Sequence, residues 1–241
     1  GVGEVLAPRL EGLMWPLFRV DGAGAAALIL GLVGGYPIGA RTTAELYREG
    51  LLRKGEAERL LAFCNTANPA FLISVLGAGG FGSVWLWLIH VLSALLTGLL
   101  FRGGAERRSA SRRRITARAV SFSTAAVQSV RRALESILSI CAFVVVFYVL
   151  ARPLRGLTGL AGAAAGGALE LFSVIPLLPA GRAGFVLASV LAGWGGVSVL
   201  FQTLAVLADS ELSTRNCLAG KAVQAAVSGA LALLAVSYVM G

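Results

Sequence analysis

The chain has 241 residues, of which 57% are apolar and only 14% are charged, whereas soluble domains carry about 25% charged residues. Three segments contain no Asp, Glu, Lys or Arg, namely residues 60–101, 183–208 and 222–241. Because a helix needs about 20 apolar residues to cross a bilayer, these segments predict an all-α, polytopic integral membrane protein. This composition excludes a soluble enzyme, and we expect no enzymatic activity.

The net charge of +9 comes mostly from one short basic segment. Its arginines are Arg102, Arg107, Arg108, Arg112, Arg113, Arg114 and Arg118. Nucleic-acid binding would require neighbouring aromatic residues or a known binding fold, and this segment has neither, so we expect no nucleic-acid partner. Arginines between membrane segments instead indicate a cytoplasmic loop. We therefore divide the chain into a first half (1–101), a basic cytoplasmic loop (102–125) and a second half (126–241), all in contact with the lipid bilayer.

The remaining composition argues against a metal or cofactor site. The three cysteines, Cys64, Cys141 and Cys217, form no CxxC motif and lie in or near apolar segments, so we expect them to be small core residues. With one histidine, His90, a zinc site or a Ser-His-Asp triad is not supported. The chain begins without an initiator Met, and we expect it to be a fragment or a processed chain that lacks upstream spans.

In the first half, residues 1–20 predict an interfacial segment or the end of a helix. Residues 22–40 are uncharged but rich in glycine, which predicts a short half-helix that ends in a broken turn, GGYPIGA. Residues 41–63 pair Glu with Arg at helical spacing, which predicts two short helices at the cytoplasmic membrane surface. A helix that starts at Pro69 and ends near Leu76 follows, and residues 84–101 predict a complete span.

The second half repeats this mixture of complete and interrupted apolar segments. Residues 126–151 predict a helix that is amphipathic at first and then fully apolar, and residues 157–174 are rich in Ala and Gly. Residues 183–208 are apolar but contain Gly-Trp-Gly-Gly in the middle, and residues 221–240 predict the final span. With an offset of 161 positions, Gly34-Gly35 matches Gly195-Gly196, and Thr42, Leu46 and Leu51 match Thr203, Leu207 and Leu212. We interpret the halves as two gate-domain-like half-repeats with broken or re-entrant helices, or alternatively as chance matching in Gly-rich sequence.

Helices that break inside a membrane are the basis for the predicted site. A break leaves backbone N–H and C=O groups without partners, which is tolerated only where protein or a water-filled cavity surrounds them. Helix N-termini at such a break attract anions, although glycine pairs can also serve only for close helix packing. The predicted substrate-binding residues are Gly34, Gly35, Tyr36, Pro37, Arg41, Asn65, Asn68, Pro69, Gly195, Gly196, Ser198 and Gln202.

Two charged residues in apolar surroundings complete the prediction. A carboxylate inside a membrane usually faces a partner or a cavity. Glu170 is therefore predicted to bind a coupling ion or to pair with Arg41 or Lys221, with a glutamate that reaches the interface as the alternative. Arg41 follows the broken turn and contacts either an anionic substrate or lipid headgroups. We expect His90 to form a hydrogen bond between helices.

The motifs at residues 31–71 also resemble a known family. GYPIGA (35–40), GLLRKGEAERLL (50–61) and NTANP (65–69) together resemble the YlbJ-type sporulation integral membrane proteins, which belong to the nucleoside-recognition gate-domain group. The resemblance covers essentially the whole chain. It implies spore formation and the movement of dipicolinic acid, a planar dianion, across the outer forespore membrane. It also implies the possibility of a homo-oligomer or of a sporulation membrane partner.

The function predicted from the sequence is transport of a small organic anion, most specifically dipicolinate. A nucleoside or ion transporter on the same scaffold is the first alternative. A membrane assembly subunit that transports nothing is the second.

Overall fold

The computed structural model describes residues 2–76, 82–104 and 121–239, and all regular structure in these ranges is helical. The helices are α1 (Val2–Phe18), α2 (Gly24–Gly34), α3 (Ile38–Arg48), α4 (Lys54–Leu60), the π-helix η1 (Phe71–Leu76), α5 (Ser83–Leu100), α6 (Phe122–Ala151), η3 (Arg152–Gly156), α7 (Gly159–Leu169), α8 (Leu171–Val174), η4 (Ile175–Leu177), α9 (Arg182–Trp194), α10 (Val197–Leu207) and α11 (Arg215–Val239). The prediction of an all-α fold is confirmed.

Four segments of the described chain are long and apolar enough to cross a membrane. They are α5, α6 with the start of η3, α9 together with α10, and α11. Large apolar side chains on these helices are exposed, as in Leu234 of α11, which is 82% exposed. Such side chains suit contact with lipid, where no polar partner is available. The prediction of a polytopic membrane protein is therefore confirmed.

Two helix pairs are interrupted at glycine, in agreement with the predicted breaks. Gly35 ends α2 with a φ of 81°, and its N–H donates to the Gly31 carbonyl over 2.9 Å. Gly195 ends α9 with a φ of 85°, and its N–H donates to the Leu191 carbonyl over 2.8 Å. Positive φ values favour glycine, which has no Cβ to clash with the backbone. Both helices thus end at a glycine with positive φ, but the two capping glycines are 160 positions apart, one fewer than the predicted offset of 161 that pairs Gly35 with Gly196.

The length of α2 explains how the first pair can lie in a membrane. Its 11 residues rise about 16 Å at 1.5 Å per residue, which is about half of a 30 Å hydrocarbon core. The apolar helix α7 also has 11 residues. Both are too short for a complete crossing, as expected for re-entrant half-helices.

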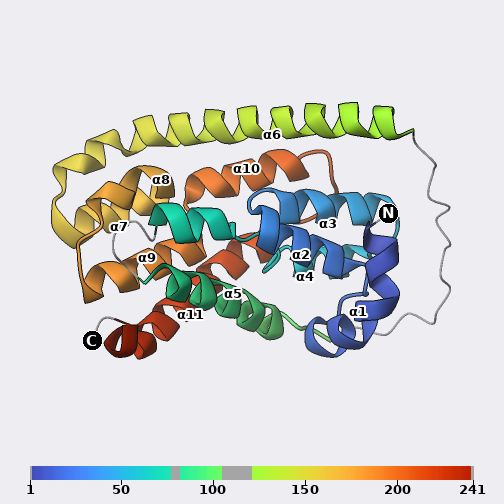
Figure 1. Cartoon of the computed structure of the whole chain (residues 1–241), viewed down its shortest axis with the longest axis horizontal. Helices are drawn as coiled ribbons and strands as arrows, with labels where there is room; N and C mark the ends of the chain where they lie inside the picture. Colours follow the sequence, from blue (N-terminus) through green and yellow to red (C-terminus); the bar gives the residue numbers. More distant parts are fainter. Residues whose placement is uncertain (1, 77–81, 105–120, 240–241) are drawn as a thin grey trace.

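Small residues allow the helices to approach closely around the segment between α4 and η1. A Cβ added at Gly31 of α2 or at Gly39 of α3 would collide with the Cys64 carbonyl oxygen. A Cβ at Gly220 of α11 would collide with the backbone of Ala62. The non-helical segment 61–68 is thus held between α2, α3 and α11. α5 and α11 pack beside each other (Figure 1).

Several predicted boundaries differ from the structure. α3 begins at Ile38, inside the predicted turn 34–40. The turn is shorter than predicted because one glycine, Gly35, is enough to end α2. α6 begins at Phe122, inside the predicted loop 102–125, because the Ser121 hydroxyl accepts the Thr124 N–H and caps the helix. α11 begins at Arg215, six residues before the predicted span.

Two further sequence predictions concern single features. Cys64 and Cys217 are buried as predicted, but Cys141 is exposed on α6, so its assignment as a core residue is wrong. Most of the predicted basic loop, residues 105–120, lies outside the described residues.

The contact at Cys64 makes a testable prediction for packing. We expect Gly39→Ala to destabilise the protein by about 1 to 3 kcal/mol, because the added methyl group collides with backbone that has little freedom to move. Thermal unfolding in detergent, followed by loss of monodisperse protein, measures the effect. Gly12→Ala is the matched control, since a Cβ there has no heavy atom within 4 Å. Equal melting temperatures for both variants would contradict the proposed packing role.

Candidate functional site

The predicted helix breaks meet at one place, which we call the break junction and define by Tyr36, Asn68, Glu170, Gly195 and Gly196. A Cβ added at Gly35 would lie 2.9 Å from the Asn68 backbone nitrogen, and one at Gly196 would lie 3.2 Å from the Leu169 carbonyl oxygen. The Tyr36 hydroxyl donates to the Ala192 carbonyl over 3.2 Å. Breaks that are up to 160 residues apart in sequence are therefore neighbours in space.

Lys221 of α11 places a buried cation beside the break junction. Its side chain is only 1% exposed. Its Nζ donates to Gln224 Oε1 over 3.0 Å and lies 4.9 Å from the centre of the Tyr36 ring, a cation–π distance. Within the described parts of the chain, no carboxylate forms an ion pair with Lys221. A charge that is buried without a counter-charge is costly and usually functional.

Further polar side chains connect Lys221 to the segment 61–68. The Gln224 amide donates to the His90 carbonyl over 3.5 Å, and His90 Nε2 accepts the Ala67 N–H over 3.0 Å. The Asn65 amide donates to the Thr203 hydroxyl of α10 over 2.7 Å. We expected the His90 side chain to form a hydrogen bond between two helices. Its ring instead accepts the backbone N–H of Ala67, which lies in the non-helical segment and has no helical carbonyl as a partner.

Four buried polar atoms in this region have no hydrogen-bond partner among the described residues: Asn65 Oδ1, His90 Nδ1, Ser198 Oγ and Gln202 Nε2. Because His90 Nε2 accepts a hydrogen bond, the neutral ring carries its proton on Nδ1, which is then a donor. His90 of α5 and Ser198 and Gln202 of α10 therefore offer three unused donors. Buried polar atoms are nearly always satisfied in native proteins, so this set suits a solute that brings its own acceptors.

Other predicted site residues have structural roles. Asn68 Oδ1 accepts the Phe71 N–H over 2.7 Å, and Pro69 takes the first helical position, which is the predicted helix start. A Cβ at Gly34 would lie 2.6 Å from Ile38 Cδ1, so this glycine serves close packing at the turn. Pro37 precedes α3 and follows Tyr36 through a cis peptide bond.

Glu170 is fully buried and binds the backbone instead of a cation. Its two carboxylate oxygens accept the Phe172 N–H over 2.8 Å and the Ser173 N–H over 2.6 Å, which caps the short helix α8. The predicted pairing with Arg41 or Lys221 does not occur, because the carboxylate is already occupied by the backbone at the break between α7 and α8.

This geometry predicts the outcome of a conservative change. Glu170→Gln keeps one acceptor oxygen and points an NH₂ group at the second N–H, so we expect a loss of about 1 kcal/mol of stability. The pH dependence of any transport should stay unchanged, which separates capping from ion coupling. Thermal unfolding and flux at several pH values measure the two effects, with the exposed Glu49→Gln as the control. A shifted pH profile would contradict the capping role.

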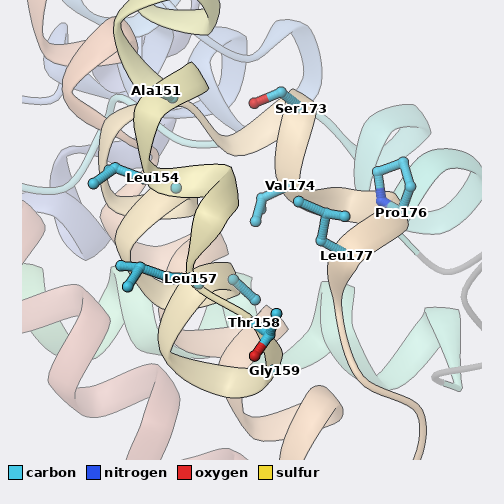
Figure 2. Close-up of a pocket in the computed structure, with 12 residues that line it drawn as sticks. Ala151, Leu154, Leu157, Thr158, Gly159, Ser173, Val174, Pro176 and Leu177 are labelled. Atoms are coloured by element: carbon cyan, nitrogen blue, oxygen red, sulfur yellow. The ribbon is translucent and has the colours of Figure 1, made fainter.

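One cavity, between η3, α7 and the turn after α8, is lined by residues outside the break junction. It has a volume of about 470 Å³. Figure 2 shows Leu154, Leu157, Val174 and Leu177 at its wall, with the Thr158 and Ser173 hydroxyls at its ends. The described residues that line it carry no charge, so it does not suit a charged solute.

Arg41 lies in the second cavity, of about 210 Å³, between α3 and α10. Arg48 and Glu45 of α3 line it together with Asp209 and Ser210, which follow α10. The structure thus separates Arg41 from the immediate surroundings of Lys221, although both were predicted to belong to one site.

Comparison with known proteins gives one informative match. The chain is 31% identical, over 96% of its length, to the sporulation integral membrane protein YlbJ of Bacillus subtilis (strain 168). This match supports a YlbJ-type family assignment. The chain spans 62% of the length of this curated relative. No family model matches the chain, and no solved structure matches it. The resemblance predicted from residues 31–71 is confirmed.

The polar stripe of α11 was not predicted from the sequence. Lys221, Gln224 and Ser228 are buried at helical spacing on one face of an otherwise apolar helix, and the Ser228 hydroxyl donates to the Ser93 hydroxyl over 2.8 Å. This spacing is a signal that the sequence contains, because residues three and four positions apart share a helix face. Gln224 is the missed residue that contacts Lys221 directly.

Burial of Lys221 also predicts how stability responds to its removal. We expect Lys221→Met to leave the free energy of unfolding unchanged or to raise it by up to about 4 kcal/mol, because a buried charge is replaced by an apolar chain of similar length. The melting temperature should then stay the same or rise. Lys54→Met, at the exposed first turn of α4, is the control. A clear loss of stability for Lys221→Met alone would show that the lysine is a structural residue.

Proposed function

We propose that this YlbJ-type chain belongs to a membrane transporter that moves a small organic anion, specifically dipicolinate, across the outer forespore membrane during sporulation. The observation that carries the proposal is the buried Lys221, which has no carboxylate partner in the described chain and lies beside the meeting point of the broken helices. The name of the curated relative supports the sporulation setting. The bacterial cell membrane is the general location that follows.

The chemistry of the junction favours an anion over a neutral solute. A substrate carboxylate would supply the counter-charge that Lys221 lacks and the acceptors that His90 Nδ1, Ser198 and Gln202 lack. A nucleoside brings no negative charge, so it would leave the lysine unpaired in apolar surroundings. The anion is therefore preferred to the nucleoside among transporters on this scaffold.

The buried junction must open for a solute to reach Lys221. Tyr36 closes it from the side of α3 through the hydrogen bond to the Ala192 carbonyl. Gly35, Gly195 and Gly196 have positive φ values on either side of this contact, where the backbone can change direction. We propose that these breaks act as hinges and that movement at them exposes the lysine, as in other gated sites.

The test is dipicolinate flux into proteoliposomes that contain the full-length protein, with and without a pH gradient. We expect Lys221→Met to lower the flux about 30-fold or more, since loss of a buried charge contact costs on the order of 2 kcal/mol or more. Lys54→Met, which changes the other lysine of this chain, should keep wild-type flux.

Three outcomes would overturn the proposal. Equal flux of dipicolinate through Lys221→Met and Lys54→Met would remove the role of the buried lysine. Competition of the flux by uridine but not by other dicarboxylates would favour a nucleoside transporter. Absence of any flux, together with loss of a co-purifying sporulation membrane protein from Lys221→Met, would favour an assembly subunit.

A further inference from the structure

The second cavity marks one end of a seam between α3 and α10. Both helices begin at the break junction, where the Tyr36 hydroxyl contacts the last turn of α9, and a Cβ at Gly195 would lie 3.1 Å from that hydroxyl. Both helices end at the cavity of about 210 Å³, which includes Arg48 and Asp209. α3 and α10 therefore run in the same direction, and the seam between them leads from the cavity to the buried junction (Figure 1).

Helical spacing aligns polar residues of α10 along this seam. Ser198, Gln202 and Val206 are four residues apart and share one face of the helix. Val206 lines the cavity, Gln202 lies one turn deeper, and Ser198 lies two turns deeper at the start of α10. The face that forms the cavity wall thus continues inward as a polar face.

The two deeper side chains are the ones that lack partners. Ser198 is fully buried and Gln202 is 2% exposed, and neither Ser198 Oγ nor Gln202 Nε2 has a hydrogen-bond partner among the described residues. The small residues Ala44 of α3 and Ala205 of α10 both line the cavity. In a packing contact between two helices, polar atoms at this depth would normally have hydrogen-bond partners.

From these observations we infer that the α3–α10 seam is the access path by which an anionic solute passes between the water-facing cavity and Lys221. Arg41 is the cation of the cavity that lies nearest the junction, one turn into α3 from the break, and Gln202 and Ser198 donate hydrogen bonds along the path. The inference rests on the proposed transport function and adds to it the route and the residues that line it.

The charges of the cavity fit an entrance of mixed sign. Arg41 and Arg48 are accompanied by Glu45 and Asp209, so the outer cavity has no net charge. The acidic residues lie toward the ends of the two helices, whereas Arg41 lies toward the junction. A carboxylate that moves inward therefore leaves the acidic residues behind and meets Arg41, the amide of Gln202 and finally Lys221.

Thiol labelling tests the path directly. In full-length protein with Cys64, Cys141 and Cys217 replaced by alanine, single cysteines are introduced as Ala205→Cys in the cavity, Gln202→Cys one turn deeper and Ala208→Cys as an exposed control just beyond α10. The probe is a small, membrane-impermeant methanethiosulfonate reagent that carries a sulfonate. Size-exclusion chromatography confirms that each variant is folded before labelling.

We expect dipicolinate to slow labelling of Ala205→Cys and Gln202→Cys about tenfold and to leave Ala208→Cys unchanged. Labelling at 202 or 205 should block dipicolinate flux, and labelling at 208 should not. If labelled Ala205→Cys keeps full flux and dipicolinate gives no protection, the path lies elsewhere and the transport proposal still stands. If the unlabelled protein shows no flux, the proposed transport function is wrong. If a thiol at position 202 never reacts with the reagent from water, the proposed path is wrong.

A kinetic test addresses Arg41 separately. We expect Arg41→Gln to raise the KM for dipicolinate flux about tenfold, because it removes the cavity cation nearest the junction while Lys221 stays in place. Arg182→Gln, at the exposed start of α9, is the control. An unchanged KM for Arg41→Gln would contradict the role of Arg41 in entry.

Discussion

A helix that stops inside a bilayer leaves backbone groups that lipid cannot bind, and this constraint explains several polar contacts of the chain. Asn68 accepts the Phe71 N–H at the start of η1, and Glu170 accepts two N–H groups at the start of α8. The Thr66 hydroxyl donates to the Gly31 carbonyl near the end of α2, and the Trp194 indole donates to the Ala168 carbonyl near the end of α7. Each interruption is thus stabilised by a side chain from its own break or from a neighbouring one.

The polar groups that remain unsatisfied differ from these in their partners. His90 Nδ1, Ser198 Oγ and Gln202 Nε2 have no hydrogen-bond partner within the described structure, and Lys221 donates to the neutral Gln224 amide instead of to a carboxylate. Such groups lower stability, so their presence in a well-packed region is explained best by a ligand that binds them. The distinction separates two kinds of buried polar residue: those that hold the broken helices together and those that receive a solute.

The pairs α2–α3 and α9–α10 give the chain its internal correspondence. Both pairs break at a glycine with positive φ, and they pack together through α3 and α10. A seam between two similar elements is able to open without unfolding either of them, because each keeps its own hydrogen bonds. This arrangement connects the predicted repeat to the proposed access path, although the extent of the repeats over residues 1–101 and 126–241 stays a prediction.

The class of the protein and the positions of its breaks could be predicted from the residues alone. Long uncharged segments predict α5 and α11, and the glycines at 34–35 and 195–196 predict the ends of α2 and α9, because these signals are local: burial in lipid requires apolar residues, and positive φ requires glycine. The start at Asn68-Pro69 is local in the same sense. The resemblance at residues 31–71 added the family.

Which polar residues share a site became known from the packing of the helices. Glu170 and Lys221 were interchangeable as candidate charges in the sequence, but Glu170 binds backbone two and three residues ahead, whereas Lys221 faces Tyr36, 185 positions earlier in the chain. Arg41 likewise lies in a cavity with Asp209 instead of beside Glu170. The reason is physical: a helix break is set by its own residues, but the partner of a buried charge is set by how distant helices pack.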